Sequence, residues 1–148
     1  MESNREIFHL LTRRFGLLDK NCCSVGNFEI STIQSHILYE IDKKHEPSMQ
    51  QIADLLAIDI TTFSRQIQSL VKMELVKKTP SQQDKRVFIL TLTVQGKFVA
   101  TSIDHSMNAY LEEVFSHMND FEKETVIRSI KLLNEAMSKS SVCCKPLY

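Results

Sequence analysis

Apolar residues recur at helical spacing over most of this chain. Two outer regions carry the longest such patterns, over about residues 4–20 and 94–137. Between them lie three shorter helical patterns, at about residues 31–44, 48–56 and 59–74. The sequence therefore predicts a mainly α-helical protein in which three short helices lie between longer outer ones.

Residues suited to helix N-termini precede several of these patterns. Ser31 and Ser48 are each followed by Gln three positions later, which is the spacing of a capping box. Asp59 is suited to accept a hydrogen bond from an amide of the first helical turn. The run from Asn119 to Glu122 restarts a helix within the second outer region. These signals predict where the helices begin.

The helical spacing breaks at Pro80 and the polar run after it. The flanking segments, residues 75–79 and 86–93, read as strands, because the second is rich in β-branched and aromatic residues. Together they predict a small β ribbon with a polar tip. Two short helices, a third helix and a ribbon are the parts of a winged helix-turn-helix. The outer helices are left over, and their apolar faces are too extensive for one small domain to cover. We therefore expect them to pack on a second copy of the chain as terminal dimerisation helices.

Composition narrows the class of protein. The chain has 148 residues, 43% of them apolar, which suits one globular domain. Three Gly and three Pro argue against a many-stranded barrel or sandwich. No window approaches the ~18 uninterrupted apolar residues of a membrane span, and the first residues are polar. We therefore expect a cytoplasmic protein that does not bind a membrane.

The formal net charge is zero, but the charge is unevenly distributed. Residues 61–99 carry seven basic and two acidic side chains, which gives this region a net charge of +5. A basic block in a neutral protein favours a local surface for a polyanion, although solvated surface charge is the alternative.

The helix predicted after Asp59 has one apolar and one polar face. At 100° per residue, five side chains form a stripe that we expect to be buried: Ile60, Phe63, Ile67, Leu70 and Val71. The opposite face is polar and basic, and carries Thr61, Thr62, Arg65, Ser69 and Lys72, with Gln68 beside them. Such a helix suits a DNA major groove, where Arg can fork onto guanine. An ordinary amphipathic surface helix would show the same pattern.

The ribbon tip favours the DNA interpretation. Lys85 and Arg86 lie between the two predicted strands, and Arg at a protruding tip suits a narrow minor groove. Asp84 is placed to hold the Arg86 side chain through a charge-assisted hydrogen bond. A solvated hairpin loop with incidental charges is the alternative.

Four segments of the central region resemble the MarR family of bacterial transcription regulators. They are residues 52–65, residues 70–76, Asp84-Lys85-Arg86 and residues 90–96, of which the Asp-x-Arg and Leu-Thr-x-x-Gly patterns are the most specific. The resemblance implies a single MarR-like domain over residues 1–148. In it, about 30–97 form the DNA-binding region, about 4–20 and 98–138 the dimerisation helices, and 139–148 a flexible tail.

The resemblance also implies function. It predicts a homodimer that binds palindromic double-stranded DNA and is released by a ligand or an oxidant, with no cofactor required. One position departs from the family, which often has Gly where this chain has Glu74. A glutamate there requires a helix end that does not rely on Gly, which leaves the geometry of this turn open.

Signatures of enzymes are absent from the sequence. It contains no Gly-rich phosphate loop, nucleophile elbow or His-Glu-x-x-His pair, and its five His are dispersed. We therefore expect no catalytic activity.

Four cysteines occur as two adjacent pairs, Cys22-Cys23 and Cys143-Cys144. This is not the spacing of a zinc ribbon, and adjacent residues are poorly placed for a disulfide with one another. Neighbouring thiols suit a thiophilic metal or metalloid, or an oxidant. In an interlocked dimer, one chain's tail would approach the other chain's loop. Incidental cysteines in a loop and a tail are the alternative.

The sequence thus favours a dimeric DNA-binding repressor that a thiol-reactive signal releases. A regulator that responds to a small aromatic or anionic ligand, with idle cysteines, is the second interpretation. A helical protein-interaction adaptor that does not bind DNA is the third.

Overall fold

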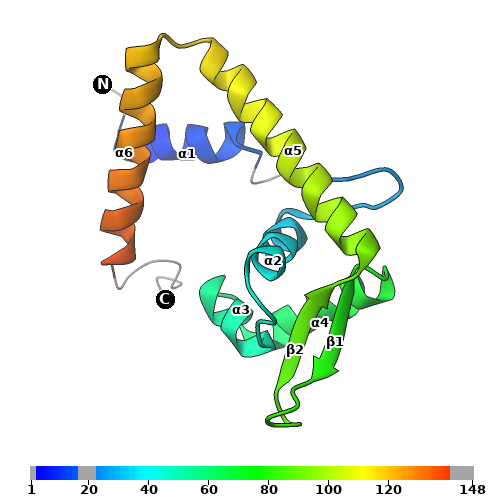
Figure 1. Ribbon diagram of the computed structural model, residues 1–148. Helices are drawn as coiled ribbons and strands as arrows, with labels where there is room; N and C mark the ends of the chain where they lie inside the picture. The colour runs from blue at the N-terminus through cyan, green and yellow to red at the C-terminus, as the bar shows by residue number, and fades with distance from the viewer. Residues whose placement is uncertain (1–2, 17–22, 141–148) are drawn as a thin grey trace. The chain divides into compact units, whose positions relative to one another are not determined.

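The computed structural model describes residues 3–16 and 23–140. Its elements run in the order α1 (Asn4–Arg14), α2 (Thr32–Lys43), α3 (Met49–Leu55), α4 (Ile60–Lys72), β1 (Val76–Pro80), β2 (Phe88–Leu92), α5 (Val94–Ser116) and α6 (Asp120–Ser138) (Figure 1). This order confirms the predicted fold class, mainly α with a small β ribbon. The chain divides into two units, with the boundary inside α5 between His105 and Ser106, and each unit is described by itself below.

The predicted helix starts are present as hydrogen bonds. Ser31 with Gln34 and Ser48 with Gln51 form complete capping boxes at α2 and α3. The carboxylate of Asp59 accepts a hydrogen bond from the amide of Thr62 at the start of α4, at 3.0 Å. Capping boxes at Ser3 and Asn119 begin α1 and α6. Each cap stabilises its helix by about 0.5–2 kcal/mol.

The first helix is shorter than predicted. It ends at Arg14, and Gly16 has a φ of +77°. Glycine adopts this left-handed conformation without steric cost and ends helices for that reason. The helix predicted over about residues 4–20 thus ends earlier, at Arg14, and residues 17–20 of that prediction lie outside the described residues.

Strands β1 and β2 pair antiparallel, with Val76 opposite Leu92 and Pro80 opposite Phe88. They lie side by side and lead into the loop that protrudes beyond them (Figure 1). The sequence predicts Pro80 just after the first strand, but Pro80 is the last residue of β1. A strand end tolerates proline. The segment before α3 joins the other edge of β2, because the amide of Leu90 donates to the Pro47 carbonyl oxygen at 2.9 Å.

The core of the first unit is built around α4. Phe63, Ile67 and Leu70 are buried there together with side chains of α2, both strands and the start of α5: Ile37, Leu38, Val76, Leu90 and Val99. The predicted stripe is wrong at its two ends, since Ile60 is 45% exposed and Val71 40% exposed. Both side chains lie at an end of the helix, where neighbouring elements cover less of its surface.

The turn after α4 keeps the geometry that glycine favours, although Glu74 occupies it. Glu74 has a φ of +60°, and its amide donates to Val71 at 2.9 Å. The amide of Leu75 donates to Leu70 at 3.0 Å, which completes a Schellman turn. The turn is held further by Thr93, whose hydroxyl donates to the Glu74 carbonyl oxygen at 2.7 Å.

Gly96 allows α5 to start close to this turn. A Cβ atom there would lie 1.9 Å from the Leu75 carbonyl oxygen, so no other residue fits without a backbone shift. The Leu-Thr-x-x-Gly pattern in the sequence therefore has a packing reason. Thr93 binds the turn, and Gly96 lets the helix pass it.

The outer helices are different. Neither α1 nor α6, both fully described, contains a buried residue. On α1 the exposed apolar side chains include Ile7 and Leu11. On α6 they are Phe121, Ile130, Leu132, Leu133 and Met137. Among the described residues, no helix has the length and apolar character needed to cross a membrane.

Candidate nucleic-acid interface

The outer face of α4 carries the predicted contact residues. Thr61, Arg65, Gln68 and Lys72 are exposed, on the side of the helix away from the buried Phe63. No described acidic side chain lies within α4. The helix therefore presents hydroxyl, amide and cationic groups along one accessible face.

Thr62 has a second role at the start of this helix. Its hydroxyl and its amide donate to the Asp59 carboxylate, and this hydrogen bonding lowers the pKa of Asp59 below its ordinary value. The carboxylate therefore stays ionised at neutral pH and caps the helix. Thr62 is half-buried, whereas Thr61 is exposed, so Thr61 is the more accessible of the two predicted contacts.

Ser69 ties α4 to α2. Its hydroxyl accepts a hydrogen bond from the side-chain amide of Gln34 at 3.3 Å. Gln34 is 8% exposed, and its amide oxygen also accepts from the Ser31 amide at 3.1 Å. Sequence reasoning recognised Gln34 as a cap and missed its bond to α4. Ser69 is thus a link between two helices as well as a predicted contact.

The predicted pair at the ribbon tip is present. The guanidinium of Arg86 donates to both carboxylate oxygens of Asp84, from Nε at 3.2 Å and from Nη2 at 3.3 Å. The Arg86 amide donates to the same carboxylate at 3.0 Å. These bonds lower the pKa of Asp84, the side-chain bonds more than the backbone bond. The Arg86 side chain is nevertheless 91% exposed, so Asp84 orients the guanidinium without covering it. Lys85 is exposed beside it.

A second cation is fixed on the ribbon by an aromatic ring. The Lys78 ammonium lies 4.5 Å from the centre of the Phe88 ring, in cation–π geometry. Lys78 belongs to β1 and Phe88 to β2. Sequence reasoning counted Lys78 only within the basic block. The sequence signal that could have predicted this contact is a lysine and an aromatic residue on the two strands of the ribbon.

A small recess lies between the starts of the two helices and the ribbon. It has a volume of about 280 Å³. Its lining comes from the start of α3, the first residue of α4 and the ribbon: Ser48, Met49, Gln50, Ile60, Lys78, Arg86, Val87 and Phe88. The recess contains two cationic groups, which are the Arg86 guanidinium held by Asp84 and the Lys78 ammonium held over the Phe88 ring.

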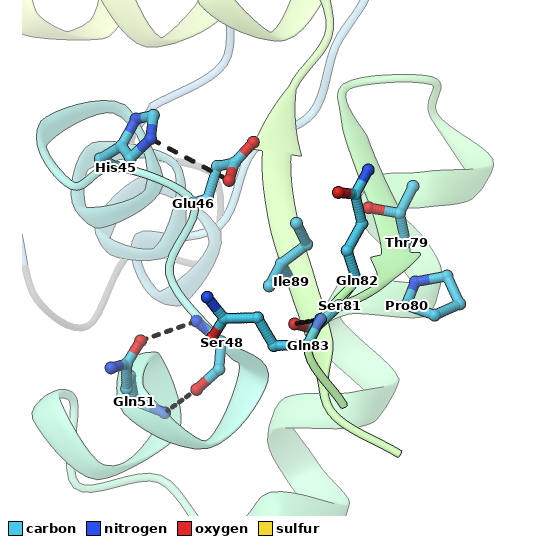
Figure 2. Close-up of a pocket in the computed structure, with 10 residues that line it drawn as sticks. All are labelled: His45, Glu46, Ser48, Gln51, Thr79, Pro80, Ser81, Gln82, Gln83 and Ile89. Carbon is cyan, nitrogen blue, oxygen red and sulfur yellow. Dashed lines mark hydrogen bonds and ion pairs between the residues drawn. The ribbon is translucent and has the colours of Figure 1, made fainter. Parts of the chain in front are cut away.

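A larger open pocket, of about 640 Å³, lies beside the polar loop of the ribbon. Figure 2 shows its lining, with Ser48 and Gln51 joined reciprocally in their capping box and the Ser81–Gln83 segment across from them. Most lining side chains are neutral and polar, and none is a predicted DNA contact. The pocket separates the loop from the start of α3.

The cysteine pairs are largely outside the described residues. Cys22, Cys143 and Cys144 lie outside the described residues, and so does the predicted approach of the tail to the loop. Cys23 is half-buried and packs against the core of the first unit, as Val25 does. Within residues 3–16 and 23–140, no three His, Cys, Asp or Glu side chains gather as a metal site would require.

Comparison with known proteins agrees with this geometry. A sequence model described as "MarR family" matches residues 30–88. The chain is 27% identical over 124 residues to YxaD of Bacillus subtilis, named an uncharacterized HTH-type transcriptional regulator, covering 84% of this chain and 85% of that protein. Relatives and fold are those of transcription regulators, not of enzymes.

Solved structures share the fold. FabT of Streptococcus pneumoniae in complex with DNA has a TM-score of 0.79 at 20% identity, over 92% of this chain and 98% of that one. The reduced form of MarR from E. coli has a TM-score of 0.76 at 19% identity, over 90% of this chain and 97% of that one. At such identities the likeness establishes the winged-helix architecture.

Proposed function

We propose that this chain is a DNA-binding transcription regulator of the MarR family, and that it acts as a homodimeric repressor that a thiol-reactive signal releases from a palindromic operator. The observation that supports DNA binding is that the chain has both an exposed polar face on α4 and an exposed Arg86 on the ribbon, which Asp84 orients.

Each part of this surface has a physical role. Arg65 and Gln68 on α4 would meet base edges in a major groove, and Lys72 a phosphate. Arg86 would enter the adjacent minor groove, where the negative potential is highest. Asp84 lowers the entropy cost of that step by orienting the guanidinium beforehand. Lys78, held over Phe88, would add a phosphate contact.

A gel-shift series tests DNA binding. Duplexes selected by the protein from a random library are titrated between about 50 and 200 mM salt. We expect a Kd that rises steeply with salt, because phosphate contacts release counterions. A protein that selects no sequence and binds no duplex at 50 mM salt would be an interaction adaptor instead.

The outer helices support the homodimer. Leu132 on α6 is 69% exposed and Phe121 77% exposed, and α1 exposes Leu11 at 55%. Monomeric soluble proteins rarely leave such faces uncovered. A second copy of the chain would cover them under two-fold symmetry, and the two α4 helices would then meet major grooves about one DNA turn apart. Sedimentation at micromolar concentration tests this, and a monomer would refute it.

The thiol-reactive signal is supported by the position of Cys23. Its side chain packs against the core in the turn that precedes α2, and α2 is bonded to α4 through Gln34 and Ser69. An adduct on Cys23 would leave its packed position and shift this turn. The shift would pass through α2 to the DNA-contacting helix.

Two double variants test the signal. Cys22→Ser with Cys23→Ser, and separately Cys143→Ser with Cys144→Ser, are titrated on the DNA complex with arsenite, zinc and peroxide. Arsenite would replace each hydroxyl by a thiolate sulfur and release one water per As–S bond. We expect the parent to release DNA and at least one double variant to retain it. Release by a small aromatic acid, unchanged in both variants, would assign the signal to a ligand and leave the cysteines idle.

A further inference from the structure

The first residue of α4 is an exposed isoleucine. Ile60 is 45% exposed, whereas the next apolar residue of the same helix face, Phe63, is fully buried. The free energy of folding gains little from a β-branched apolar side chain left in water. Ile60 therefore has an apolar surface available for another molecule.

The surroundings of Ile60 indicate which molecule that is. Ile60 lines the recess together with Met49, Val87 and Phe88, so its surface continues as an apolar wall. The Lys78 and Arg86 cations line the same recess. The first turn of a recognition helix faces base edges, and the preceding helix crosses the phosphate backbone. An apolar wall beside the Lys78 ammonium at this position matches an apolar group next to a phosphate.

We propose that Ile60 reads the C5-methyl group of a thymine in each half-site, an inference that rests on the proposed DNA-binding function. Thymine is the base that presents a methyl group in the major groove. The other bases would place an amino group or an acceptor against the isoleucine, and that polar group would lose its hydrogen bond to water. Lys78, which is proposed above to contact a phosphate, holds the neighbouring backbone and sets the distance between Ile60 and the base edge.

Deoxyuridine substitution tests the proposal, since it removes the thymine methyl group and keeps the base pair. The duplex is the one that the wild-type protein selects from a random library, and each thymine is replaced in turn. At one position per half-site, we expect the affinity to fall about four-fold, the value of one buried methyl group. Ile60→Ala should bind thymine and deoxyuridine duplexes equally, and Ile60→Val should restore part of the difference.

Val71→Ala is the matched control. Val71 is also an exposed apolar residue of α4, 40% exposed, at the opposite end of the helix. It should keep the four-fold preference for thymine, and both alanine variants should show the wild-type unfolding midpoint within error. Sequence-specific binding with no deoxyuridine effect, or with an effect that persists in Ile60→Ala, would overturn the inference and leave the DNA-binding function intact. Loss of selection by the wild-type protein would refute the function itself.

Discussion

The DNA-binding region and the terminal helices use the same apolar spacing with different results. In α4 the spacing buries Phe63, Ile67 and Leu70 against elements of the same chain. In α6 a similar spacing leaves every residue at least partly exposed. Hydrophobic periodicity therefore predicts a helix and its apolar face, but not whether the chain itself covers that face. The core of the first unit forms within one chain, whereas α1 and α6 leave their apolar side chains exposed.

The largest expected effect comes from cutting a side chain in the complete core. Phe63→Ala should lower the free energy of unfolding by about 3–5 kcal/mol, because Phe63 is fully buried and a cavity would remain. Chemical denaturation measures this loss, which should not depend on protein concentration.

Phe121→Ala sharpens the contrast. Phe121 is the same residue type, 77% exposed on α6, so its loss should matter only as far as a second copy covers it. Its effect on unfolding should shrink as the protein is diluted. An equal, concentration-independent loss in both variants would mean that α6 is part of a core within one chain.

A charge on the outer helix is the second test. Leu132→Asp should weaken the dimer by at least ~2 kcal/mol, roughly thirty-fold in Kd, because an unpaired carboxylate would be buried at the interface. Sedimentation across a concentration series measures this shift. Asn134→Asp adds the same charge two residues away, at an exposed polar position of α6, and serves as the control. Equal dimerisation of both variants would remove Leu132 from the interface.

Much of this structure follows from local sequence, and the exceptions have physical causes. Caps at Ser31, Ser48 and Asp59 were predictable, because each cap depends on residues within three positions of it. The Asp84–Arg86 pair was predictable for the same reason. Exposure at Ile60 was not, because it depends on where other elements stop covering α4.

Contacts between distant residues show the same limit. The Gln34–Ser69 bond joins positions 35 apart, and the Lys78–Phe88 contact needs the strand register. Periodicity carries no information on either. The turn at Glu74 is a different case, because it has the left-handed geometry that glycine favours although a glutamate occupies it.

The third prediction separates the two arginines of the DNA-binding region. Arg65→Ala should weaken specific binding by about 1–3 kcal/mol and relax selection at one base pair, if its guanidinium forks onto guanine. Arg86→Ala should cost less and reduce the slope of log K against log salt by about 1, since it removes one groove or phosphate contact. Fluorescence anisotropy at several salt concentrations distinguishes them. Unchanged affinity in both variants would contradict the winged-helix surface.

The smallest expected effect lies in the turn between α4 and β1. Glu74→Gly should raise the free energy of unfolding by roughly 0.5–1 kcal/mol, because glycine adopts a φ of +60° without the ~1–2 kcal/mol cost of a side chain. The larger backbone entropy of glycine in the unfolded chain offsets part of that gain. The Schellman bonds and the Thr93 bond use only backbone atoms of residue 74, so glycine preserves them. Glu74→Ala is the control, since it removes the charge and keeps the left-handed strain. A denaturant midpoint that rises in Glu74→Gly and not in Glu74→Ala would assign the effect to backbone geometry. A rise in both would assign it to the lost carboxylate.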